Sequence, residues 1–306
     1  MLEVLKSLKN IIEKFIINRQ SITETASAGS TTLKIGSTRR FNAGDKVVVL
    51  ELTPDYGEPA CELHTVAEII DKETMTIETA LSSDYSTDCF VQKLIGTDPS
   101  EGDFVKHVFL GDPPVIRTFP AITVDAKNQD AEWMTLESVQ DQFGVDITVY
   151  VTQDNYESQY EMMHHYVKAI RYALFRSLYP LVEPYRSTTL VEDFAADATD
   201  FKVEDEEIFL NSWGIVFFEN ACQLRVARVE SYLGSGVYRL NVPLGREFEA
   251  GDSVILPLRH IFNTIPHSVN FGTVNKEGTM LKASVISWRG LEEMRIGAPY
   301  IDPMLF

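Results

Sequence analysis

The sequence predicts an α+β fold, in which a small mixed sheet carries one long helix and an N-terminal helix, and two duplicated all-β modules (barrels or sandwiches) are attached to this core. Three observations support this class. A strand pattern with apolar residues at every second position precedes a helix pattern with apolar residues three and four positions apart, and a set of short strand patterns occurs twice in the chain.

The central unit lies between residues 119 and 178. It begins with an apolar strand at residues 119–125 and continues with a strand at 144–152, whose alternate residues are apolar: Val145, Ile147, Val149 and Val151. From Tyr156 to Leu178, apolar side chains three and four positions apart form one stripe, which predicts a long amphipathic helix that Pro180 ends. A strand at residues 279–288 completes the predicted sheet.

Both ends of the chain carry apolar side chains that need a partner. Residues 2–18 predict an amphipathic helix that docks on the central unit or on a neighbouring subunit. Glu3 and Glu13 dilute the cationic face that a membrane-surface helix favours. The segment from Ile296 to Phe306 is apolar and contains prolines, which indicates an end docked on its own domain or on a neighbour.

Short strand patterns separated by turn residues fill the region from Ile22 to about Leu94 and predict a small β module. A similar order of patterns returns after residue 191. Asp200-Phe201-Lys202-Val203 resembles Thr32-Leu33-Lys34-Ile35, and Val226-Ala227-Arg228-Val229 resembles Val66-Ala67-Glu68-Ile69. We interpret the match as an internal duplication, to which a chance similarity between two β meanders is the alternative.

These patterns divide the chain into five predicted segments. They are an N-terminal helix of the core (1–19), β module A (20–96), the α+β core (97–190), β module B (191–267), and a final core strand with the C-terminal tail (268–306). The chain is therefore expected to leave the core and return to it twice.

The composition limits the function classes. The net charge of −18 argues against a general nucleic-acid-binding surface, because such affinity comes mainly from Lys and Arg neutralising phosphates. Three scattered cysteines, Cys61, Cys89 and Cys222, do not make a disulfide framework or a zinc site. No run approaches the roughly 20 apolar residues that span a bilayer, and no signal-peptide pattern opens the sequence, so we expect synthesis and assembly in the cytoplasm without a membrane partner.

The sequence contains no convincing catalytic or metal-binding motif. It has neither a phosphate-binding glycine loop nor a nucleophile elbow. Glu161 and His164 have Glu-x-x-His spacing, and His165 adds an imidazole, but such a pair holds a metal only when a second helix supplies a matching set. The run 204–207 lacks the alternating spacing of a calcium loop and favours a solvated turn. We expect no enzymatic activity, no cofactor and no metal.

The stretch Val115-Ile116-Arg117-Thr118-Phe119-Pro120-Ala121-Ile122-Thr123-Val124 resembles the proline-containing strand of the tail terminator (tail completion) proteins of tailed bacteriophages. The following order of elements is also similar: a polar turn, a Val/Ile strand ending near Thr152, a helix from about Tyr156 and a strand at 279–288. The helix at residues 2–18 fits the N-terminal helix of that family, while the two β modules depart from its minimal pattern. The resemblance covers roughly half of the chain.

The resemblance implies a structural virion protein of the phage tail and neck. Proteins of that family form a hexameric ring that caps the tail tube, joins the tail to the neck and lets DNA pass without specific binding. The implied partners are further copies of the chain, the tail tube protein, a sheath protein, and neck or head-completion proteins. The alternatives are another phage neck, head-completion or baseplate protein, and a glycan-binding or carbohydrate-active protein that uses the β modules.

We expect the ring contacts to come from the central sheet and helix, with the β modules on the outer rim. Apolar residues near the two ends are the predicted contributors to the subunit interface: Leu5, Ile12, Phe15, Met304, Leu305 and Phe306. Closed cyclic symmetry buries one such patch per subunit without forming fibres.

Overall fold

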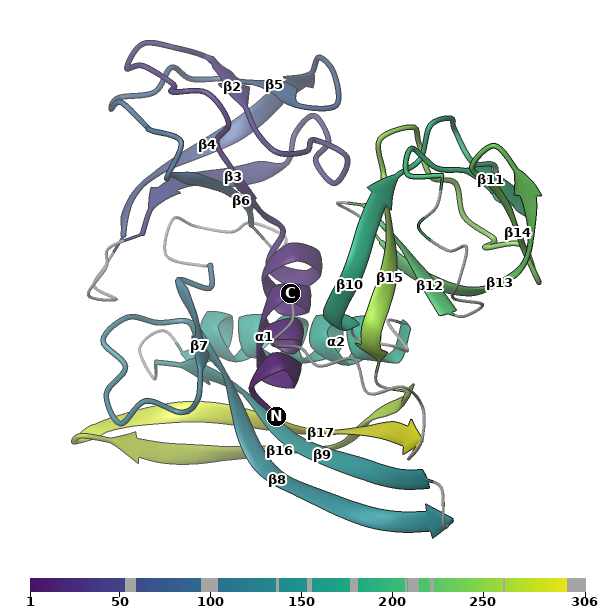
Figure 1. The fold of residues 1–306 in the computed structure, drawn as a ribbon. Coiled ribbons are helices and arrows are strands. Elements are labelled where there is room, and N and C mark those ends of the chain that lie inside the picture. The colour runs from purple at the N-terminus through teal and green to yellow at the C-terminus, as the bar shows by residue number, and fades with distance from the viewer. Residues whose placement is uncertain are drawn as a thin grey trace.

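A computed structural model of the chain describes residues 1–52, 59–94, 104–135, 138–152, 156–176, 181–206, 208, 215–220, 223–260 and 262–295. It contains a central sheet with two helices on one face, and two β modules that both lie on the helix side of that sheet (Figure 1). No helix in this part of the chain is long and apolar enough to cross a bilayer.

The central sheet has five strands in the order β16-β17-β9-β8-β7. Its members are β7 (His107–Leu110), β8 (Ala121–Thr135), β9 (Ser138–Val151), β16 (Phe262–Lys276) and β17 (Thr279–Arg295). The pair β7–β8 is parallel, and the other pairs are antiparallel. Strands β8 and β9 form one long hairpin, and β16 and β17 form another, so the sheet extends well beyond the two helices (Figure 1).

Helix α1 (Leu2–Ile11) continues directly as a π-helix, η1 (Ile12–Ile17), and helix α2 (Tyr156–Arg176) follows β9. Both pack on the sheet face that carries the alternate apolar residues of β9, including the fully buried Ile147 and Val149. Met163, Ile170 and the other apolar positions of α2 complete this core. Each fully buried aliphatic side chain stabilises the fold by about 1.5–3 kcal/mol relative to exposure, so the two periodic patterns fix how these elements face each other.

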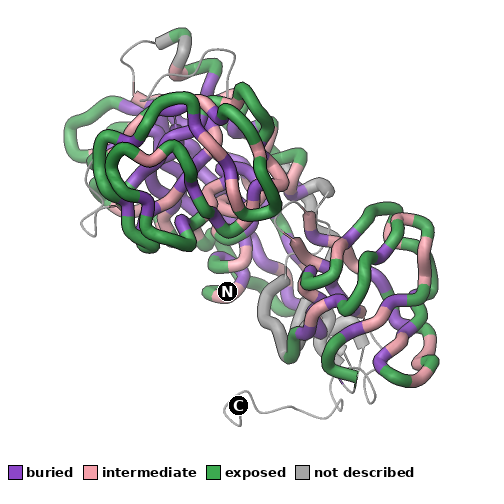
Figure 2. The backbone as a smooth tube through the Cα atoms, turned by 90° about the horizontal axis from the view of Figure 1, so that it is seen from above, coloured by how far each residue is buried: buried purple, intermediate pink, exposed green. Residues whose placement is uncertain are grey.

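Module A contains β1 (Arg19–Ser21), β2 (Thr32–Lys34), β3 (Lys46–Glu51), β4 (Ala60–Ile69), β5 (Thr74–Ile77) and β6 (Phe90–Lys93), in the order β1-β6-β3-β4-β5-β2. Module B contains β10 (Leu181–Thr189), β11 (Asp200–Lys202), β12 (Ile215–Glu219), β13 (Leu224–Gly234), β14 (Val237–Leu240) and β15 (Ser253–His260), in the order β10-β15-β12-β13-β14-β11. Single bridges join the two end strands, Ile22 with Ile35 and Leu190 with Val203, so each sheet closes on itself around a buried interior (Figure 2).

The two modules share individual pairings as well as strand order. Val66 pairs with Ile77 immediately before a bulge in β4, and Val229 pairs with Leu240 immediately before the equivalent bulge in β13. Val229 therefore corresponds to Val66. The sequence comparison had matched Val229 with Ile69, which is three residues further along the chain. The error arose because short β patterns of period two match one another in several registers. The common pairings support a duplication of one ancestral module.

The interiors of the modules differ in side-chain size. Among the described residues, five buried aromatic side chains fill module B: Phe194, Phe201, Phe218, Tyr238 and Phe248. The equivalent interior positions of module A hold Ala26, Leu33, Val49, Met75 and Tyr85. The two modules thus keep the same strand pairing although their core side chains differ. Protein cores tolerate such substitutions when the alternation of inward and outward positions is kept.

Each module also buries part of its outer surface on the central body. In β3, Val47 and Val49 point into module A, while Val48 and Leu50 point outward and pack with Phe104. The residue of β12 that corresponds to Val48 is Phe217, which packs with Phe15 of η1. A Lys14–Glu219 ion pair at 2.5 Å adds to this contact. The outward side of β3 in module A and the outward side of β12 in module B therefore both face the central body.

The α+β class with a small sheet and a long helix, predicted from the sequence, is wrong. The structure is mostly β, with strands making up 51% and helices 14% of the described residues. The prediction undercounted the strands, because much of β8 and most of β16 are exposed and lack the alternating apolar pattern by which strands are found. In addition, β10 begins at Leu181 and β16 at Phe262, both earlier than the predicted boundaries at 191 and 268.

Candidate functional site

The strongest candidate for a binding surface is a groove between α2 and β16, which we call the α2–β16 groove. It has a volume of about 580 Å³, and its lining residues are His164, Val167, Lys168, Arg171, Tyr172, Val269 and Phe271. The imidazole of His164 stacks on the ring of Phe271, with centroids 4.7 Å apart, and meets the edge of Tyr160 at 4.4 Å. The groove joins an aromatic surface to two cationic side chains.

The aromatic side chains of the groove are unusually exposed. Phe271 is 47% exposed and Tyr172 is 59% exposed. Lys168 and Arg171 are exposed on the adjacent turns of α2, in a chain whose net charge is −18. Clustered exposed aromatic residues, rimmed by charged side chains, are typical of a surface that binds another macromolecule.

The groove lies beside an open strand edge. Strand β16 is the outer strand of the central sheet, and on its outer side no other strand in the described ranges pairs with it. Glu277 and Gly278 both have positive φ (45° and 86°), as a two-residue type I′ hairpin turn requires. Lys276 and Thr279 then form the first hydrogen-bonded pair, so that the backbone N–H groups of Phe271 and Thr273 point outward. Such an edge is a ready template for another strand.

The histidine pair on α2 lies in this region. His164 is half-buried in its aromatic contacts, whereas His165 is exposed. Within the described residues, no three His, Cys, Asp or Glu side chains come together as a metal-binding group. The chemical contribution of His164 in this arrangement is therefore a ring contact that holds Phe271 against α2.

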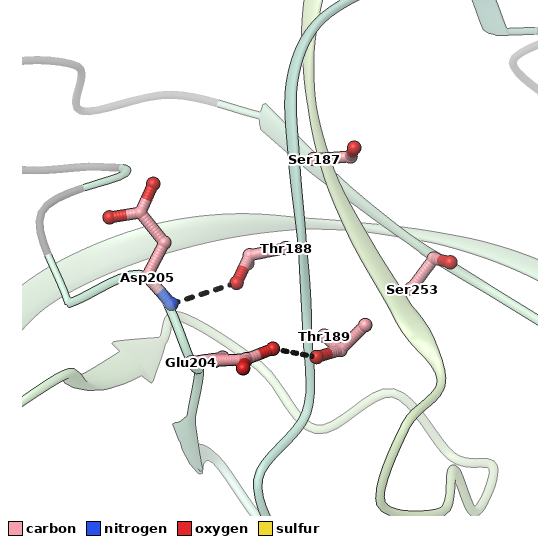
Figure 3. Close-up of a pocket in the computed structure, with 6 residues that line it drawn as sticks. All are labelled: Ser187, Thr188, Thr189, Glu204, Asp205 and Ser253. Carbon is pink, nitrogen blue, oxygen red and sulfur yellow. Dashed lines mark hydrogen bonds between the residues drawn. The ribbon is translucent and has the colours of Figure 1, made fainter.

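A second hollow of about 470 Å³ lies on module B (Figure 3). Its lining residues are Ser187, Thr188, Thr189, Glu204, Asp205 and Ser253. The hydroxyl of Thr189 donates to Glu204 Oε2 at 2.9 Å, and the backbone N–H of Asp205 donates to Thr188 Oγ1 at 2.9 Å. Hydroxyl and carboxylate oxygens of this kind can hydrogen-bond a polar ligand such as a sugar. Glu204 and Asp205 are exposed, as predicted for a solvated turn.

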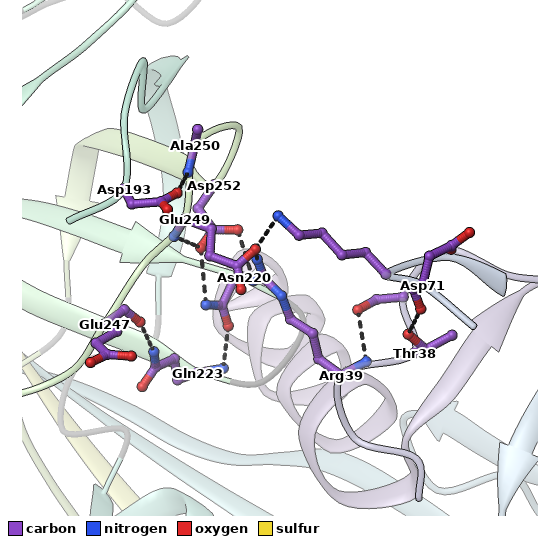
Figure 4. Close-up of polar contacts among 12 residues, drawn as sticks. Thr38, Arg39, Asp71, Asp193, Asn220, Gln223, Glu247, Glu249, Ala250 and Asp252 are labelled. Atoms are coloured by element: carbon purple, nitrogen blue, oxygen red, sulfur yellow. Dashed lines mark hydrogen bonds and ion pairs between the residues drawn. The ribbon is translucent and has the colours of Figure 1, made fainter. Parts of the chain in front are cut away.

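An ion-pair network joins the two modules (Figure 4). Arg39 of module A donates to Asp252 Oδ1 at 2.8 Å and lies 2.9 Å from Glu249 Oε2, and Lys72 also pairs with Glu249. The hydrogen bond from Lys72 is the largest cause that lowers the pKa of Glu249. Asn220 Nδ2 donates to the second oxygen of Asp252 at 3.2 Å. The network fixes the loop after β2 against the turn before β15.

One carboxylate in module A has a strongly perturbed pKa. Burial favours the neutral form of Glu62, but hydrogen bonds from the backbone and side chain of Ser82, and from Tyr85 and Ser83, outweigh it and lower its pKa to about 2. The Ser82 N–H lies 2.8 Å from Glu62 Oε2. Burial raises the pKa of the Tyr85 hydroxyl, and its hydrogen bond to Glu62 raises it further. Because these groups tie the β5–β6 connection to β4, we assign them a structural role.

The predicted interface residues that the structure describes do not line the α2–β16 groove. Leu5 and Ile12 are buried in the core of this chain, and Phe15 packs against module B. Met304, Leu305 and Phe306 lie outside the described residues. Among the described residues, the half-buried Cys61 and the buried Cys89 are in no disulfide, and Cys222 lies outside the described ranges.

The sequence analysis missed the α2–β16 groove for two reasons. It assigned Tyr160 to the buried stripe of the helix, although this side chain is 37% exposed. It also assigned no strand to the residues around Phe271. The available signal was the four-residue spacing of Tyr160 and His164, together with the alternation of Val269 and Phe271.

No protein-family model matches the sequence, and no curated protein matches it. Among solved structures, the chain is similar to three tailspikes: Gp54 of Acinetobacter baumannii bacteriophage AP22, in complex with A. baumannii capsular saccharide (15% identity, TM-score 0.22), gp61 of Pseudomonas phage phi297 (22%, 0.23) and gp49 of Pseudomonas phage LKA1 (22%, 0.23). The matches cover 24%, 26% and 30% of this chain and only 14%, 14% and 15% of the respective tailspikes.

Proposed function

We propose that this chain is a structural protein of the tail of a tailed bacteriophage, and within that class a subunit of the tail terminator ring, which caps the tail tube and joins it to the neck. The observation that carries the proposal is the open edge of the 15-residue strand β16 beside the exposed aromatic α2–β16 groove. A long, unpaired edge next to an apolar patch favours assembly with another protein chain.

The face of the central sheet that points away from the helices supports the same proposal. Beyond a buried apolar cluster that includes Tyr150 and Leu281, this face carries Asp125, Asp146 and Ser287, and the hydroxyl of Ser287 donates to Asp146 Oδ1 at 2.6 Å. The nearby Lys127 is neutralised by an ion pair with Asp146 at 3.1 Å. If this face lines a ring opening, the carboxylates of Asp125 and Asp146 repel DNA phosphates and the exposed Arg289 is the cation that they meet beside Ser287, which suits passage with weak binding.

Glycan binding is the second candidate, and the hydroxyl- and carboxylate-lined hollow on module B favours it (Figure 3). The two candidates differ in the surface that they use, because the hollow lies on module B and the open edge on the central sheet. Another neck, head-completion or baseplate protein would use the same open edge as the terminator ring.

Labelling of phage particles tests the proposed function. Antibodies raised against module A are applied to particles of the phage whose genome encodes the chain, and their position is read by negative-stain microscopy. We expect labels at the junction of tail and neck. Labels on fibres or spikes, together with retention of the purified chain on a capsular-polysaccharide column, would favour glycan binding and refute the terminator assignment. Labels at the baseplate would also refute it.

A further inference from the structure

We propose that the two open edges of the central sheet pair with each other between neighbouring copies of this chain, β16 of one copy with β8 of the next. Repetition of this contact closes a ring whose inner layer is one continuous antiparallel sheet. The inference deepens the proposed function, because it names the contact by which the ring assembles.

The second open edge lies on β8. Strand β7 pairs only with Ala121–Val124, and across the rest of β8 no other strand in the described ranges lies on the outer side. The Val124 carbonyl accepts a hydrogen bond from the Gly111 N–H at 2.8 Å. At the start of β8, the backbone N–H and C=O groups of the even-numbered residues therefore point towards the outer edge of the sheet. The bulge between Ala126 and Asn128 shifts this alternation by one residue. Beyond the bulge, the backbone N–H groups of Gln129 and Ala131 point towards the outer edge.

The directions of the two edges match. Each pairing from β16 through β17 and β9 to β8 is antiparallel, so β16 and β8 run in opposite directions. A rotation about an axis roughly along the strands preserves their direction, and β16 of one copy then meets β8 of the next in the antiparallel sense. Because the contact joins two different surfaces, it is heterologous, and a heterologous contact forms a ring when its rotation closes.

The open stretches are offset along the sheet. Phe271 lies level with Ser284, Val149 and Ile122, so the regular part of β16 faces the covered start of β8. The open part of β8 lies further towards the hairpin end. Pairing between copies therefore requires a shift along the strands, and a sheet that closes with such a shift has strands tilted to the ring axis, as β-barrels do.

The side chains on the two faces are compatible with this pairing. On the helix face, small or neutral residues of β8, Gln129 and Ala131, would meet the exposed Phe271, and the cations Lys168 and Arg171 lie on that same face. On the opposite face, β8 presents Asp130 and Glu132, while β16 presents Asn270 and Gly272. Because neither of these two β16 residues is charged, the pairing places no like charges opposite each other.

Proline substitutions test the two edges separately. Thr273→Pro removes an outward N–H of β16, and Ala131→Pro removes an outward N–H of β8, while neither group is needed for pairing within the chain. We expect each variant to sediment as a monomer under conditions where the wild type sediments as a ring. The matched controls Thr273→Val and Ala131→Ser keep the N–H groups and are expected to form rings. Circular dichroism melting checks folding, and Phe271→Lys, which leaves the backbone donors in place, is expected to give the same loss of rings.

Mixing the two proline variants gives the sharpest result. Thr273→Pro retains only the β8 edge and Ala131→Pro only the β16 edge, so an equal mixture is expected to form 1:1 dimers and no ring. Rings from both proline variants would overturn the inference, as would a wild type that stays monomeric at its highest soluble concentration. Assembly of Ala131→Pro alone would show that β16 pairs with β16. Particle labelling at the neck combined with any of these results would leave the proposed function standing while this contact fails.

Discussion

Replacing Phe218 by alanine tests how the interior of module B is held together. Phe218 is fully buried in β12, and its ring centroid lies 5.7 Å from that of Phe194, 5.0 Å from Phe201 and 5.6 Å from Phe248. These separations fall in the range where aromatic pairs stabilise beyond simple burial. The substitution therefore removes the ring that contacts the other three phenylalanines.

The expected cost follows from burial and from the matched position in module A. Truncating a buried phenylalanine to alanine typically lowers the free energy of unfolding by about 3–5 kcal/mol, because the lost burial is accompanied by a cavity. Val49 occupies the equivalent position of module A, and Val49→Ala removes only two methyl groups, at a cost of about 2 kcal/mol. Equivalent truncations in the two modules should thus differ by about 1–3 kcal/mol.

Hydrogen exchange with mass spectrometry on the full chain separates the two modules. Peptides from β12 and β13 of Phe218→Ala should exchange about a hundredfold faster or more, since each ~1.4 kcal/mol is a factor of ten. Peptides from β3 and β4 should be unchanged, and Val49→Ala should reverse the pattern. Equal acceleration in both modules, or less than about a tenfold change in module B, would refute the reasoning that each module is a separate core.

Three further predictions concern polar groups. Arg39→Ala should lower the free energy of unfolding by about 1–2 kcal/mol in chemical denaturation, whereas the control Lys34→Ala, at a fully exposed ion pair, should leave it unchanged. The pKa of Glu62 is about 2 in the folded chain, below the ordinary value of about 4.3, so its stabilisation is full above about pH 4.3 and is lost as the pH falls towards 2. Glu62→Gln should flatten this loss in acid melting curves. Zinc should leave the melting temperature of the wild type and of the His164→Ala, His165→Ala double variant unchanged, and a zinc-induced rise confined to the wild type would contradict it.

Patterns produced by burial could be predicted from the sequence. The apolar alternation of β9 and the three-and-four spacing of α2 both arise because one side of each element packs into the common core. The repeated order of short strands was also visible, because both modules alternate inward and outward residues around a closed sheet. These signals located the elements without giving their register.

Features that burial does not produce could not be predicted. Beyond the helices, β8 exposes both of its faces, so its open stretch carries polar residues in succession and no alternation. The Arg39–Asp252 pair joins residues 213 positions apart, and neither residue type has a periodic signature. Phe271 was hidden for the opposite reason: its apolar side chain is exposed, and sequence analysis treats an isolated aromatic residue as core.

The contact between each module and the central body determines where the modules would lie in a ring. Val48 and the corresponding Phe217 occupy equivalent outward positions, and both face the central body. The duplicated modules therefore kept the same docking surface while their interiors changed. Both modules lie on the helix side of the central sheet, and neither covers the opposite face, which carries Asp125 and Asp146 beside the apolar cluster of Tyr150 and Leu281 (Figure 1). If the open edges close a ring with this opposite face inward, the helices form a second layer and the modules project from the rim. The hollow of module B then lies away from the ring contacts, where it remains accessible to neighbouring proteins.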